Sequence, residues 1–158
     1  MFSTAALARK LDLVNIGAAG TFIARRSVTA AQLSREIPFT LDLAIRPAPE
    51  VLKLVDAGPP KAPAATRIFV TVLVGTPKAA PRLPREFPAG TPWALRIVKR
   101  RGPYVLAVRR TDRQRGLDLN AIVEKAFGAR ATTRGWPTFE RIAKALRSLE
   151  APATRARR

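Results

Sequence analysis

Apolar and polar positions alternate most regularly near the middle of the chain. In WALRIVK (residues 93–99) and again in PYVLAVRR (residues 103–110), apolar side chains recur at every second position. This period of two, interrupted at Gly102, predicts two paired strands. Residues 119–127 then carry apolar side chains at helical spacing, with Asp118 suited to the N-cap and Gly128 to the C-terminal end. The pattern predicts a β-β-α unit with its own core.

Three segments upstream also follow a recognisable period. Phe39 to Ile45 alternates, which predicts a half-buried strand. Pro49 suits the first turn of a helix that continues through Val55. Residues 66–74 are apolar on both faces, as expected of a central strand covered on two sides. A strand, a helix and a strand in this order predict a β-α-β unit with a right-handed crossover.

The two ends of the chain are predicted to be helical. A short helix is expected from Ser3 to Asn15, and one or two helical turns between residues 29 and 36. A last helix begins near Trp136, with a buried stripe formed by Phe139, Ile142, Ala143, Leu146 and Leu149. The segment ARATTRG (residues 129–135) between the last two helices is interpreted as a basic linker.

Together these elements predict an α+β protein, an α/β two-layer sandwich with a mixed sheet of about four strands and two or three helices. Residues 1–37 would form an N-terminal arm, residues 38–150 a single domain, and residues 151–158 a basic tail. Residues 75–92 contain five prolines and two glycines. This composition disfavours helix and strand, so a Pro-rich basic loop is expected there.

Charge changes the interpretation of these elements. The chain of 158 residues contains 29 basic and 11 acidic residues, a net charge of +18. Arginine dominates the basic residues, and its planar guanidinium group binds phosphate in a bidentate manner and stacks on bases. A basic excess of this size favours a nucleic-acid partner.

The composition also argues against catalysis. The chain contains neither Cys nor His, which removes thiol, disulfide, zinc-cluster and imidazole chemistry. Asp112 and Asp118 are the nearest candidates for a pair of acids that act together, and Asp118 is already expected to cap a helix. We therefore expect no enzyme activity, no metal and no cofactor.

The first 30 residues resemble a targeting segment. They contain Arg9, Lys10, Arg25 and Arg26 against the single acid Asp12, as in an Arg-rich mitochondrial transit peptide. An ordinary amphipathic first helix explains the same residues equally well. No apolar run reaches the ~18 residues that a membrane-spanning helix needs. These features favour the mitochondrial matrix and argue against direct membrane insertion.

The expected phosphate contacts lie on the paired strands, the Pro-rich loop, the last linker and the tail. They are Lys78, Arg82, Arg85, Arg96, Lys99, Arg100, Arg101, Arg109, Arg110, Arg113, Arg115, Arg130, Arg134, Arg155, Arg157 and Arg158. Such contacts position a protein on nucleic acid without reading its sequence. Trp93 and Tyr104 are expected in the core, which leaves Trp136 as the candidate for base stacking.

The segment VRRTDRQRGLDLNAIVEKAFG (residues 108–128), with the chain to residue 150, resembles the C-terminal substrate-binding domain of DHH-family phosphoesterases. Arg109 or Arg110 matches the arginine at the end of that family's strand, Asp118 and Asn120 match its helix start, and Gly128 matches the entry to its GGGH loop. The following residues 129–132 supply neither the further glycines nor the histidine, and the catalytic domain is absent. The resemblance implies a nucleic-acid-binding fold without phosphoesterase activity.

Three functions remain open from the sequence. The leading hypothesis is a structural subunit of a mitochondrial ribosome that contacts ribosomal RNA and neighbouring ribosomal proteins in a large assembly. The alternative is an accessory scaffold subunit of a mitochondrial membrane complex, such as ATP synthase or a respiratory complex, with its basic surface towards acidic subunits or anionic lipid. A DNA-binding protein is disfavoured because the linker between the last two helices is too long for a helix-turn-helix motif.

Overall fold

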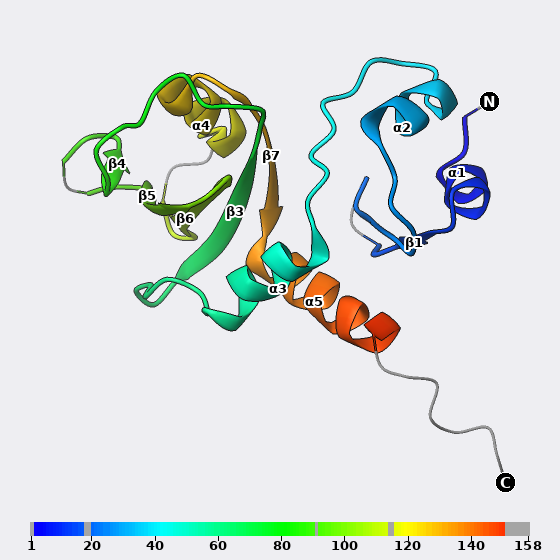
Figure 1. Ribbon diagram of the computed structural model, residues 1–158. Coiled ribbons are helices and arrows are strands. Elements are labelled where there is room, and N and C mark those ends of the chain that lie inside the picture. The colour runs from blue at the N-terminus through cyan, green and yellow to red at the C-terminus, as the bar shows by residue number, and fades with distance from the viewer. Residues whose placement is uncertain (1, 18–19, 91, 114–115, 151–158) are drawn as a thin grey trace, which may run out of the picture. The chain divides into compact units, whose positions relative to one another are not determined.

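The computed structural model describes residues 2–17, 20–90, 92–113 and 116–150 (Figure 1). Within these residues the chain forms five α-helices, a five-stranded antiparallel sheet and a two-stranded hairpin. The expected α+β class is confirmed. The chain divides into two compact units: unit 1 comprises Met1–Leu41, Ile45–Asp56 and Pro137–Arg158, and unit 2 comprises Asp42–Ala44 and Ala57–Trp136.

Unit 2 contains the larger sheet. Its strands are β3 (Thr66–Val74), β4 (Arg85–Phe87), β5 (Leu95–Arg101), β6 (Tyr104–Arg110) and β7 (Arg130–Gly135). Their order is β4-β5-β6-β3-β7, and every neighbouring pair is antiparallel. The prediction of a mixed sheet of about four strands is therefore wrong, because no parallel crossover joins two strands of this sheet.

The predicted strand pair is confirmed as the β5–β6 hairpin. Arg101 lies opposite Tyr104, which leaves a two-residue turn. Gly102 has a φ of 56°, and such tight turns need a positive φ that glycine adopts without steric cost. The register shifts between Ile97 and Lys99, so a bulge interrupts β5 near the turn.

The central position expected for β3 is also confirmed. Its neighbours are β6 and β7, and Val70 and Thr71, which point to opposite faces, are both fully buried. A strand that is buried on both faces needs apolar side chains at consecutive positions, which explains the uninterrupted apolar run in its sequence.

Two further strands lie where the sequence analysis expected loops. β7 replaces the predicted basic linker, with Thr132 and Thr133 in its middle and arginines near both ends. β-branched threonines favour a pleated, half-buried edge, and charged residues are common on edge strands. β4 covers only three residues of the Pro-rich loop, between Pro84 and Pro88.

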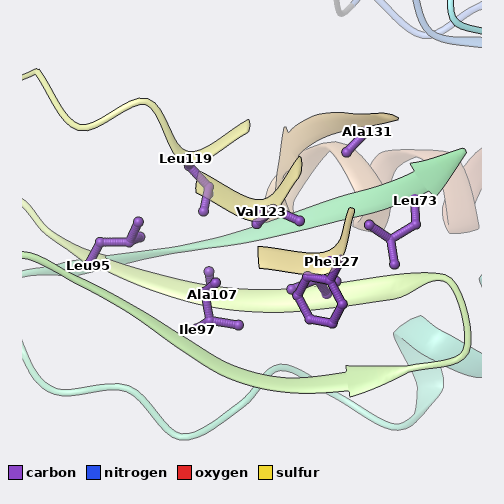
Figure 2. Close-up of a cluster of buried hydrophobic side chains, with 9 residues drawn as sticks. Leu73, Leu95, Ile97, Ala107, Leu119, Val123, Phe127 and Ala131 are labelled. Carbon is purple, nitrogen blue, oxygen red and sulfur yellow. The ribbon is translucent and has the colours of Figure 1, made fainter. Parts of the chain in front are cut away.

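Helix α4 (Leu119–Phe127) packs on β7 and β3 and encloses the core of unit 2 (Figure 1). Both predicted caps are present: the Asp118 side chain accepts a hydrogen bond from the Ala121 amide, and Gly128 is left-handed. Figure 2 shows the core that α4 closes, and most of its side chains are almost fully buried. The cluster consists of Leu73, Leu95, Ile97, Val105, Ala107, Leu119, Val123, Phe127 and Ala131.

Unit 1 contains smaller elements. They are α1 (Thr4–Lys10), the hairpin of β1 (Leu13–Asn15) and β2 (Phe22–Ala24), α2 (Ala30–Glu36), α3 (Ala48–Asp56) and most of α5 (Trp136–Glu150). Helix α1 is shorter than expected, because the chain turns at Asp12 into β1. The predicted helical segment at residues 29–36 and the helix that starts near Pro49 are confirmed as α2 and α3.

Three sequence interpretations in these regions are wrong. Phe39 to Ile45 has no strand partner, and Phe39, Leu41 and Ile45 are exposed. Leu149 is also exposed, because it lies on a different side of α5 from the buried Phe139, Ala143 and Leu146. Trp136 is buried at the start of α5, so it is not available to stack on a base.

Among the described residues, no helix combines the length and apolar character needed to span a membrane.

Candidate nucleic-acid interface

The structure describes twelve of the sixteen expected phosphate contacts. Arg115, Arg155, Arg157 and Arg158 lie outside the described residues, as does the predicted basic tail at 151–158. The twelve fall into three groups according to what already binds their guanidinium or ammonium groups. This division decides which of them can bind a phosphate without first losing a partner.

Three of the arginines are already paired with acids. Arg96 donates two hydrogen bonds to Glu86 at 2.9 and 2.5 Å, and its guanidinium carbon lies 4.2 Å from the centre of the Trp93 ring. Arg110 contacts the same ring at 4.8 Å and lies 4.0 Å from Asp112. For Arg96 in particular, the carboxylate occupies the fork that a phosphate would need.

Arg130 is the third paired arginine. It donates a hydrogen bond to Asp42 at 2.9 Å and lies 3.8 Å from Glu124. The hydrogen bond to Asp42, followed by the charges of Asp42 and Glu124, raises the pKa of Arg130. Its charge is therefore compensated within the protein, and it is a poorer candidate for phosphate binding than the sequence suggested.

A second group donates hydrogen bonds to uncharged acceptors. Arg100 donates to the Gly102 carbonyl at 2.6 Å, and Arg101 to the Gly58 carbonyl at 3.2 Å. The third member is Arg134, which donates to the Thr133 carbonyl at 2.7 Å.

Arg109 is the most constrained member of this second group. It donates to the Leu117 carbonyl and stacks on Phe69 at 5.7 Å. Its Nε is buried and has no hydrogen-bond partner among the described residues. The guanidinium group is therefore fixed in one orientation, and among the described residues it forms no ion pair with an acid.

The third group has neither a hydrogen bond nor an ion pair from its side chains in the described part of the chain. Its members are Lys78, Arg82, Arg85, Lys99 and Arg113. All except Lys99 are exposed, and Arg85 stacks on Phe87 at 5.4 Å. These cations are free to bind phosphate, and four of the five lie on the Pro-rich loop or the β5–β6 hairpin, as expected.

Sequence analysis missed Arg67, which the fold places beside Arg109. The two arginines lie directly opposite each other on β3 and β6, and Arg67 is exposed, with no hydrogen bond or ion pair among the described residues. Like charges at directly opposed positions destabilise a sheet. The pairing of Arg67 with Arg109 could not be predicted, because the register between two strands cannot be derived from the sequence of either strand alone.

Arg67, Arg109 and Arg113 together form what we call the β3–β6 cationic end. Arg113 follows the last residue of β6 by three positions. The nearby acid Asp112 is exposed and lies beside Arg110, at 4.0 Å. Arg109 is held in place by its contacts, Arg67 lies opposite it, and the exposed Arg113 follows four residues later. Such a set of arginines is suited to bind successive phosphates of a nucleic-acid backbone.

The described residues contain no cluster of three or more acids that could hold a metal ion. No family model matches the chain, and neither a curated protein nor a solved structure matches it.

Proposed function

We propose that this protein is a structural RNA-binding subunit of a mitochondrial ribosome, and that the β3–β6 cationic end is the centre of its contact with ribosomal RNA. The observation that supports this most strongly is the opposed pair Arg67 and Arg109, neither of which forms an ion pair with an acid among the described residues. A folded protein that fixes two like charges side by side loses stability unless a polyanion neutralises them. The phosphate backbone supplies that neutralisation.

The proposed mechanism is charge neutralisation by cations of the sheet and by exposed cations of the Pro-rich loop. Arg67 and Arg109 would contact adjacent phosphates, while Lys78, Arg82 and Arg85 of the Pro-rich loop would follow the backbone further along. Each contact releases condensed counterions, so the affinity falls steeply with salt. Contacts of this kind position the protein on RNA without sequence selectivity and require no catalytic group or cofactor.

The choice of RNA within a large assembly is supported by the net charge of +18 and by the transit-like composition of the first 30 residues. Neighbouring ribosomal proteins would cover the remaining exposed surface. The mitochondrial matrix is the compartment that this proposal requires.

The test is binding of ribosomal RNA fragments across a salt series with Arg67→Gln/Arg113→Gln. Both side chains are exposed and unpaired, so the fold should be retained. Losing two phosphate contacts should reduce the slope of log affinity against log salt by about 2 and weaken binding by about tenfold at moderate salt. The matched control is Arg35→Gln/Lys53→Gln, which removes two exposed cations from α2 and α3 of unit 1.

The control variant should keep the wild-type slope. An equal loss in both variants would show that binding is spread over the surface, and the β3–β6 cationic end would lose its special role. A wild-type protein without measurable RNA affinity at moderate salt would overturn the proposed function itself. Co-sedimentation of the tagged protein with mitochondrial ribosomal subunits tests the assembly, and its absence from those fractions would contradict it.

A further inference from the structure

A cavity of about 390 Å³ lies within unit 1, away from the residues discussed above. Val14 of β1, Arg25 at the end of β2 and the outer side of α5 form its walls. The α5 residues include Arg141, Lys144 and Ala145, and Ser148 and Leu149 continue the same stripe at helical spacing. This stripe differs from the buried stripe of α5 and is open to solvent.

Three cations line the cavity: Arg141, Lys144 and Arg25. They differ in the partners that their side chains already have. Arg141 is oriented by hydrogen bonds to Thr138 Oγ1 at 3.3 Å and to the Ile16 carbonyl at 3.5 Å. Neither acceptor carries a charge, so the positive charge of Arg141 stays uncompensated by them.

Lys144 is exposed, and its ammonium group has no hydrogen bond or ion pair among the described residues. Arg25 lies 3.8 Å from Asp12, in a pair whose two side chains are about half exposed, and Asp12 is shared with Arg26 at 4.0 Å. A surface pair at such distances contributes little, so Arg25 can exchange Asp12 for another carboxylate at low cost.

Apart from Ser148, the rest of the lining is aliphatic. Val14, Ala145 and Leu149 supply apolar surface, and Leu149 is 43% exposed, one of few large apolar side chains left in solvent. Aliphatic surface in an open cavity favours burial by another apolar side chain. Among the described residues, none of those that line the cavity is aromatic, and bases use aromatic side chains for stacking.

We propose that this cavity, which we call the α5 groove, docks an acidic and apolar segment of a partner protein. An aliphatic or aromatic side chain of the partner would cover Val14 and Leu149, and flanking carboxylates would pair with Arg141, Lys144 and Arg25. Charge complementarity selects an acidic partner, and the aliphatic wall selects a protein segment over a bare polyanion. The groove thus gives the molecule a protein-binding surface separate from its proposed RNA contact.

The experiment measures fluorescence anisotropy with the full-length protein and a labelled twelve-residue peptide of Leu, Phe and Glu. Two companion peptides separate the apolar contribution to binding from the electrostatic one. The first replaces Leu and Phe by Ser, and the second replaces Glu by Gln. Wild-type protein should bind the first peptide more tightly than either companion. Arg25→Glu/Lys144→Glu should weaken that binding by about tenfold, and Leu149→Ser by about fivefold.

Arg35→Glu/Lys53→Glu is the matched control, because it reverses the same number of exposed cations elsewhere in unit 1 and should leave peptide binding within about twofold. Thermal melts confirm that each variant is folded. Equal affinity for the Ser-substituted peptide, or an equal loss in the control variant, would overturn the proposal, because either would reveal general attraction to polyanions.

Ribosomal RNA fragments and vesicles containing anionic lipid serve as competitors. A specific groove resists displacement by both at equal negative charge. RNA that displaces the peptide and loses affinity in Leu149→Ser would reassign the groove to nucleic acid, and vesicles that do so would reassign it to lipid; both outcomes contradict the proposal. Since these variants leave Arg67, Arg109 and Arg113 intact, failure here would not bear on the RNA-binding test.

Discussion

At the scale of single residues, the most informative contact is a short chain of hydrogen bonds inside unit 2. The Thr71 and Thr133 hydroxyl oxygens lie 2.7 Å apart, and Thr133 donates to Asn120 Oδ1 at 3.0 Å. Since the hydroxyl of Thr133 has one hydrogen, Thr71 must be the donor in the first bond. Thr71 is fully buried, whereas Thr133 is partly exposed.

With Thr71 as the donor to Thr133, the substitutions Thr133→Val and Thr71→Val should lower the free energy of unfolding by different amounts. Thr133→Val leaves the buried Thr71 hydroxyl without a partner and should lower the free energy of unfolding by about 1–3 kcal/mol. Thr71→Val removes the buried group itself, and water can replace it at Thr133, so the loss should stay below about 1 kcal/mol. Urea unfolding of both single variants and the double variant measures the difference. Equal losses, or a double variant no more stable than Thr133→Val, would contradict the assigned donor.

At the scale of elements, α2 shows what a cap contributes when packing contributes little. None of its residues is buried, and a complete capping box holds its start: the Gln32 amide donates to Thr29 Oγ1 at 3.2 Å, and the Thr29 amide donates to Gln32 Oε1 at 2.8 Å. An exposed helix of seven residues is too short to be stable from propensity alone. Its local stability must therefore depend strongly on the cap.

Thr29→Ala should destabilise α2 locally by about 1 kcal/mol. Amide hydrogen exchange should accelerate about fivefold for residues 33–37, while the global melting temperature changes little. Ser3→Ala in α1 is the comparison, because Ser3 makes only one capping bond, at 3.4 Å. Unchanged exchange in α2, together with a lower global melting temperature, would show that the helix is held by packing instead.

The elements that could be predicted from sequence are those whose signals are local. The β5–β6 hairpin and α4 have strong periodicity, and Asp118 and Gly128 mark the ends of α4. β3 has a continuous apolar run. All three were therefore expected. β7 was missed because RATTRG consists mostly of polar residues, two threonines and two arginines, and its strand character comes from pairing with β3. The strand predicted for Phe39 to Ile45 is the opposite case: its apolar residues alternate as in a strand, but no strand pairs with it.

The same limit applies to the candidate site. The basic hairpin was expected from composition, yet the sequence could not separate Arg96 and Arg130, which are paired with acids, from Arg113 and Lys99, which are free. It also could not reveal Arg67 beside Arg109, because that neighbour is set by the register between β3 and β6. Charge is readable from sequence, whereas its compensation depends on contacts between distant residues.

At the scale of the whole molecule, the excess of positive charge should limit the stability of the isolated protein. The net charge is +18, and self-repulsion of this size opposes the compact state. The ion pairs that offset it are weak, because most of them are partly or largely exposed, such as Lys10 with Glu36 and Arg147 with Asp56. Repulsion should therefore outweigh attraction at low salt.

This balance predicts that the melting temperature rises with salt. The screening length falls from about 30 Å at 0.01 M to about 8 Å at 0.15 M, and each kcal/mol of relieved repulsion should raise the melting temperature by about 3 °C. Arg67→Gln should melt higher than wild type at low salt and show a smaller salt dependence, because it removes one member of the opposed pair with Arg109. Lys53→Gln removes the same charge from an exposed site on α3 and should do less. A melting temperature that falls as KCl is added would mean that the ion pairs dominate. The opposed Arg67 and Arg109 would then cost the free protein little stability, and a polyanion would have little repulsion to relieve.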